Sequence, residues 1–68
     1  MEEFDKLRTI GRCKYVKNLI DAANAMLNEC RFGRDGKMID CEETDRIWKI
    51  EIKLKEIQEE VETLMKTI

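Results

Sequence analysis

Residues 47–68 constrain the fold most strongly, because apolar side chains recur there at alternating steps of three and four residues. This 3.5-residue repeat is typical of a helix that packs along one side against another helix. We call this set the seam: Ile47, Ile50, Leu54, Ile57, Val61, Leu64 and Ile68. The seam predicts a helix that needs a partner helix, but it carries no information about a function.

A second apolar repeat in the first half of the chain supplies that partner. Its inner positions are Cys13, Val16, Ile20, Ala23, Leu27 and Cys30. We expect the first helix to span about residues 3–32 and to continue through a weak point at Gly11, since glycine disfavours helix. Acidic residues near the start, such as Glu3 and Asp5, suit a helix N-terminus, because negative charges are favourable there.

Residues 33–40 separate the two helices and carry turn signals. Gly33 suits the left-handed residue that ends a helix, and Asp35-Gly36 is a tight-turn dipeptide. Asp40, with Glu43 three residues later, favours a helix N-cap. The second helix is therefore expected over about 41–67. Two helices of matched length around a short turn predict an all-α antiparallel hairpin, a single domain over residues 1–68 with no sheet.

The first helix carries more apolar surface than one partner helix covers. Beside its inner positions lies a second apolar column, formed by Tyr15, Leu19, Ala22 and Met26. A chain of 68 residues also builds only a thin core. We therefore expect a homodimer that uses this column as its oligomer interface and forms a four-helix bundle.

The composition argues against catalysis. The chain has no histidine, serine or proline and no glycine-rich phosphate loop, so the commonest general base and a serine nucleophile are both missing. Three cysteines at spacings unlike a zinc site indicate reduced thiols in a cytoplasmic protein. No apolar run is long enough to span a membrane. We expect no enzyme activity, no cofactor and no metal.

The turn resembles the second half of an EF-hand calcium loop. With Asp35 at loop position 5, Gly36 and Glu42 fall at the positions of the turn glycine and the bidentate ligand. Arg31 and Gly33 then occupy the first and third ligand positions. A cation and a residue without a side-chain oxygen exclude calcium there. The expectation is a plain corner between helices.

Trp48 and Ile52 depart from the seam and lie one helical turn apart, on the opposite face of the second helix. Tryptophan is enriched among interface anchors. These two residues, with Cys41, Phe32 and Met38 near the turn, are therefore the candidate binding site for a protein partner. An alternative expectation is that the turn folds over Trp48 and covers it.

A second function class rests on the basic residues of the first helix. Arg8, Arg12, Lys14 and Lys17 are candidates for contacts with RNA or DNA, but they do not cluster on one helix face. The net charge of −2 does not favour a nucleic-acid coat either. The pattern resembles the small helical-hairpin regulators of plasmids and phages, although no motif carries over. The sequence thus favours a non-catalytic protein-binding regulator or inhibitor, of the kind that phages and mobile elements encode, over a nucleic-acid-binding dimer.

Overall fold

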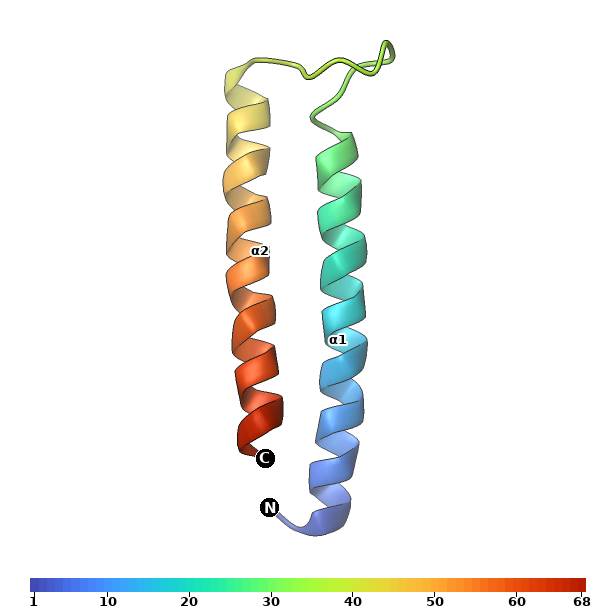
Figure 1. Cartoon of the computed structure of the whole chain (residues 1–68), viewed down its shortest axis with the longest axis vertical. Helices are drawn as coiled ribbons and strands as arrows, with labels where there is room; N and C mark the ends of the chain where they lie inside the picture. The colour runs from blue at the N-terminus through green and yellow to red at the C-terminus, as the bar shows by residue number, and fades with distance from the viewer.

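The computed structural model describes all 68 residues as one antiparallel helical hairpin (Figure 1). Helix α1 spans Glu3–Glu29 and helix α2 spans Glu42–Thr67. The two helices pack side by side, and the two ends of the chain lie near one another at the end opposite the loop. The molecule measures 51 × 17 × 12 Å. The all-α hairpin expected from the two apolar repeats is confirmed.

Helix α1 runs without interruption through Gly11, so residues 3–10 belong to the same helix as the rest. It ends at Glu29, three residues before the expected end. The backbone tightens there, because the N–H groups of Arg31 and Phe32 donate to carbonyls three residues back, at 3.1 and 3.2 Å. Such short-range bonds are a usual way of satisfying the last carbonyls of a helix.

The connecting loop, residues 30–41, extends beyond the ends of the two helices and turns back sharply before α2 begins (Figure 1). Gly33 does not end the helix in a left-handed conformation, as the sequence suggested. Its N–H donates to the Lys37 carbonyl at 2.9 Å, and its carbonyl accepts from Gly36 N–H at 3.0 Å. Gly36 is the residue with positive φ, at 78°. The tight turn at Asp35-Gly36 is confirmed, and Asp35 Oδ1 accepts from Lys37 N–H at 3.0 Å.

The start of α2 differs from the expected cap. The N-cap is Cys41 rather than Asp40. The buried hydroxyl of Thr44 accepts from the Cys41 N–H at 3.2 Å and donates to the Ile39 carbonyl at 2.8 Å. Thr44 therefore takes the role that Glu43 was expected to play, and it also ties the end of the loop to the first turn of α2.

The hairpin uses only one of the two seam columns. Ile47, Leu54, Val61 and Ile68 are partly covered. Ile50, Ile57 and Leu64 instead remain 46–48% exposed, so the expectation that Ile57 is buried is wrong for the single chain. Helix α2 is rotated so that a column of Thr44, Glu51, Gln58 and Met65 faces α1 beside the covered seam residues.

Helix α1 is likewise rotated about its own axis, relative to the orientation expected from its apolar repeat. Cys13 and Ile20 are buried and Leu27 is partly covered, as expected, but Val16 and Cys30 are exposed. Lys17, Asn24 and Arg31 are partly covered in their place. Cys13 and Ile20 are the only buried apolar residues, so the core of one chain is very thin. Neither helix is long and apolar enough to cross a membrane.

Candidate interaction surface

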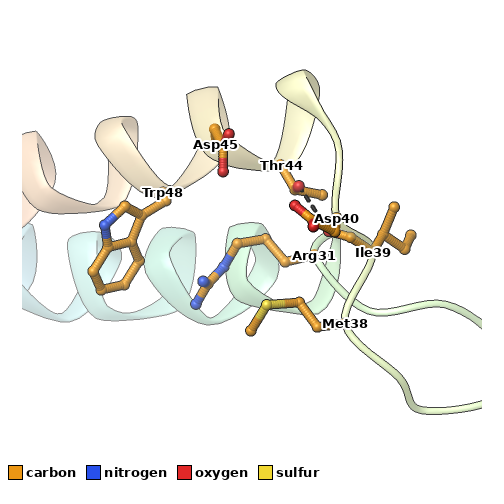
Figure 2. A pocket seen from close by; sticks show the side chains of 7 residues that line it. All are labelled: Arg31, Met38, Ile39, Asp40, Thr44, Asp45 and Trp48. Carbon is orange, nitrogen blue, oxygen red and sulfur yellow. Dashed lines mark hydrogen bonds between the residues drawn. The ribbon is translucent and has the colours of Figure 1, made fainter.

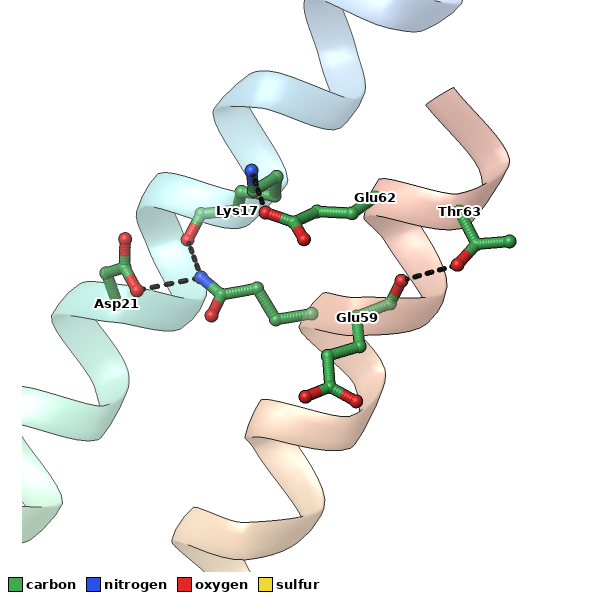
Figure 3. Close-up of polar contacts among 6 residues, drawn as sticks. Lys17, Asp21, Glu59, Glu62 and Thr63 are labelled. Carbon is green, nitrogen blue, oxygen red and sulfur yellow. Dashed lines mark hydrogen bonds and ion pairs between the residues drawn. The ribbon is translucent and has the colours of Figure 1, made fainter. Parts of the chain in front are cut away.

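Polar side chains join the two helices near the middle of the hairpin (Figure 3). Lys17 Nζ lies 2.5 Å from Glu62 Oε1. The Gln58 amide donates to Asp21 Oδ1 at 2.7 Å and to the Lys17 carbonyl at 3.0 Å. The hydrogen bond and the positive charge of Lys17 lower the pKa of Glu62. These contacts fix the register of α1 against α2, because they bring residues 17–21 level with residues 58–62.

A second polar group lies at the loop end. Arg31 Nε lies 2.9 Å from Glu51 Oε2, and the two side chains are only 15% and 11% exposed. The Arg31 guanidinium also lies over the Trp48 ring, 4.8 Å from its centroid. A guanidinium over an indole is a favourable cation–π arrangement. Arg31, two residues beyond the end of α1, thus contacts both Glu51 and Trp48 on α2.

Trp48 separates two shallow hollows that share Arg31. The first, of about 220 Å³, is lined at the loop end by Arg31, Met38, Ile39, Asp40, Thr44, Asp45 and Trp48 (Figure 2). The second, of about 240 Å³, is lined along the helices by Asn24, Asn28, Arg31, Trp48, Glu51, Ile52 and Lys55. Trp48 is 50% exposed and Ile52 is 41% exposed. One face of the indole is thus occupied by Arg31, while half of the side chain remains open to solvent.

The residues of the expected protein-binding site are only partly brought together. Trp48 and Ile52 share the second hollow, and Met38 lines the first. Phe32 pairs with Met38 through a backbone bridge but lines neither hollow. Trp48 lies beside the interhelical interface rather than opposite it, because α2 is rotated. The loop does not bury Trp48.

Cys41 is also separate from the two hollows. It is partly covered at the start of α2, where its thiol lies 3.7 Å from Thr44 Oγ1. Hydrogen bonds from the Glu43 backbone N–H and the Cys41 thiol lower the pKa of Glu43. The expected inner position of Cys30 is wrong, since this residue is exposed, and all three thiols are free. Cys41 therefore belongs to the helix cap rather than to the Trp48 surface.

The basic residues of α1 do not form a common patch. Arg8, Arg12 and Lys14 are exposed, whereas Lys17 is partly covered and paired with Glu62. At 100° per residue, Arg12 and Lys14 point about 160° apart around α1. These side chains therefore provide no continuous basic surface for a phosphate backbone.

The column proposed as an oligomer interface is open in the single chain. Tyr15, Leu19, Ala22 and Met26 are all exposed, with Met26 at 69%. The exposed seam residues Ile50, Ile57 and Leu64 add to this apolar surface. Their exposure was not expected from the sequence, which placed them in the core of the hairpin.

Arg31 and Glu51 were not singled out from the sequence, although a signal for them exists. Polar residues recur at seven-residue steps beside the apolar columns: Lys17 and Asn24 in α1 with Arg31 just beyond its end, and Thr44, Glu51 and Gln58 in α2. A sustained polar column at heptad spacing indicates paired polar contacts between helices, because unpaired polar groups there are costly. The two columns meet in the hairpin.

No group of three or more acidic, histidine or cysteine side chains lies close enough together to hold a metal ion. Comparison of the chain with protein-family models, with curated proteins and with solved structures gives no significant match.

Proposed function

We propose that this hairpin is a non-catalytic protein-binding regulator or inhibitor that contacts its partner through a surface centred on Trp48. The supporting observation is the half-exposed indole, held on one side by Arg31 and flanked by Ile52. An aromatic side chain already fixed in position loses little conformational entropy on binding. Tryptophan and arginine are also the residue types that most often dominate binding energy at interfaces.

The two hollows on either side of Trp48 fit this proposal. Each is small and open, of a size that takes one or two side chains of a partner rather than a cofactor. Ile52 adds apolar area to one of them, and Lys55, Asp45 and Asp40 are charged residues in their linings. A central aromatic anchor within a polar rim is the usual anatomy of a protein–protein interface.

Self-association is part of the same proposal. We infer that the chain works as a homodimer, because the exposed apolar side chains of Leu19, Ile50 and Ile57 line neither of the hollows beside Trp48. A second copy that covers them leaves the Trp48 surface free for a different partner. The alternative of a nucleic-acid-binding dimer has no support from the scattered placement of Arg8, Arg12 and Lys14.

The test is capture of partner proteins from the native host with wild-type and variant hairpins. Trp48→Ala and Ile52→Ala are expected to lose the captured protein while retaining helicity. Glu59→Ala, an exposed change further along α2, is the matched control and should retain it. The binding loss for Trp48→Ala should reach about 2 kcal/mol or more if the indole is an anchor. Equal capture by all variants would refute the proposed surface.

A further inference from the structure

Exposed apolar side chains from both helices form a single face of the hairpin. At 100° per residue, Ile57 lies about 60° to one side of the covered Leu54 on α2, and Glu62 lies about 80° to the other side. On α1, Val16 lies about 40° to one side of the buried Ile20, and Lys17 about 60° to the other. The two polar flanks meet, since Lys17 contacts Glu62.

Because the polar flanks share one side of the hairpin, the apolar flanks share the other. We call this other side the apolar face; it comprises Val16, Leu19, Ala23, Met26, Ile50, Ile57 and Leu64. All except the partly covered Ala23 are exposed in the single chain. No charged residue of α1 between Val16 and Met26 lies on this face, because Lys17 and Asp21 both belong to the polar flank.

The solvent-accessible surface of the single chain is larger than that of a typical folded monomer of the same mass. It measures 5708 Å², whereas a folded monomer of 8.1 kDa exposes about 4,500 Å². The broad side of the hairpin measures 51 by 17 Å, and a stable interface takes ~800 Å² from each partner. The apolar face occupies the middle of this side, because Ile50 and Leu64 lie about 21 Å apart along α2. The broad side of the hairpin is therefore large enough for a stable interface with a second copy of this chain, and the apolar face lies at its centre.

Two symmetric arrangements bring the apolar faces of two copies together. A two-fold axis along the helices places both loops at the same end and α2 on α1 of the partner copy. An axis across the helices places the loops at opposite ends, with each helix antiparallel to its own copy. The two arrangements differ in which residues meet, so the sequence distinguishes between them.

The apolar face is centred on one level of the hairpin. On α2 its residues are spaced evenly about Ile57, and on α1 they run from Val16 to Met26, centred on position 21. The hydrogen bond from Gln58 to Asp21 shows that these two centres are level. A two-fold axis across the helices must pass through the centre of the apolar-face residues of α1 and through the centre of those of α2. In this chain the two centres are level, so a single axis can pass through both.

Charges beside the face favour the same arrangement. Lys53 precedes Ile57 by four residues, and Glu60 follows it by three, both at the outer edge of the apolar face and both exposed. An axis across the helices at Ile57 places Lys53 of each copy beside Glu60 of the other. An axis along the helices instead places Lys53 level with Met26 and Glu60 level with Leu19 of the other copy, and neither α1 residue is charged.

We propose that two hairpins pair through the apolar face with their loops at opposite ends, on a two-fold axis at Ile57. Ile57 then packs on its own copy, Ile50 packs on Leu64, and Leu19 packs on the small Ala23. The two Trp48 surfaces lie on the outer sides and near opposite ends of the four-helix bundle. This arrangement rests on the self-association proposed above and specifies its geometry.

Cross-linking of the full chain tests the axis. In a background of Cys13→Ala, Cys30→Ala and Cys41→Ser, Ile57→Cys should form a covalent dimer under mild oxidation, because a disulfide requires the Cα atoms within about 7 Å. Glu59→Cys in the same background is the control and should not. Circular dichroism verifies that both variants remain helical.

Charge reversal gives an independent test without cysteines. Lys53→Glu and Glu60→Lys should each raise the dimer dissociation constant about tenfold. Each reversal converts two attractive contacts across the interface into two contacts between like charges. The double variant Lys53→Glu/Glu60→Lys should return to within about twofold of wild type. A dimer that neither cross-links at residue 57 nor responds to these reversals overturns the axis while leaving self-association intact. A monomer at high concentration overturns both.

Discussion

At the scale of single residues, the Lys17–Glu62 pair makes a pH-dependent prediction. Its contact lowers the pKa of Glu62 below the ordinary value of 4.5. A carboxylate whose pKa is lowered by folding stabilises the fold above its unfolded pKa, and that stabilisation is lost as the pH falls through the folded pKa. Removal of the Lys17 charge should therefore matter at neutral pH and not in strong acid.

The measurement is an NMR titration of Glu62 in wild type and in Lys17→Met. The wild-type carboxyl should titrate below pH 4.5, and the variant carboxyl should titrate higher. The difference in melting temperature between the two proteins should shrink as the pH is lowered past the Glu62 titration. An unchanged Glu62 pKa in Lys17→Met would show that the pair does not form in solution.

Thr44 makes a second prediction at this scale. Its buried hydroxyl serves both the Cys41 N–H and the Ile39 carbonyl. Thr44→Val keeps the shape but leaves two backbone groups without a partner, and should cost about 1–2 kcal/mol of stability. Thr44→Ser retains the hydroxyl and should cost less. Chemical denaturation followed by circular dichroism ranks the two, and an equal loss would mean that the methyl group rather than the hydroxyl matters.

At the scale of the helices and loop, the glycines give opposite predictions. Gly11 lies inside α1, and an added Cβ meets nothing within 4 Å. Gly11→Ala should therefore stabilise the hairpin by about 0.5–1 kcal/mol. Gly36 is equally open but has a φ of 78°. Gly36→Ala should destabilise the protein by about 1 kcal/mol, because an alanine in that conformation is strained. Thermal melts of the two variants should shift in opposite directions.

The elements themselves were predictable, but their rotation was not. The apolar spacing of the seam and the Asp35-Gly36 turn are local signals, and they place two helices and a corner correctly. The side of α2 that faces α1 depends on pairing between distant polar residues, such as Lys17 with Glu62. The apolar spacing of Ile50, Ile57 and Leu64 is the same whether these residues face a helix of the same chain or of another chain, so the spacing does not tell which helix covers them. The sequence singled out Trp48 from its position off the seam, but the contact of Trp48 with Arg31 depends on the helix rotation.

A single hairpin is far from compact. Its radius of gyration is 15.9 Å, against about 11 Å for a globular domain of 68 residues. Only two apolar residues are buried, so in the proposed dimer most of the apolar burial comes from a second copy. Stability should then rise with protein concentration, since association stabilises only the folded chain.

Leu54 and Ile57 separate the two sources of that stability. Leu54 lies between α1 and α2, so Leu54→Ala should lower the melting temperature at every concentration, with a cost of about 2 kcal/mol. Ile57 is exposed in the single hairpin, so Ile57→Ala should have little effect in dilute solution and a growing effect as wild type dimerises. Thermal melts over a hundredfold range of concentration, with sedimentation equilibrium on the same samples, provide both readouts. A wild-type melting temperature that does not change with concentration, together with an 8.1 kDa species throughout, would show that the single hairpin is the stable unit.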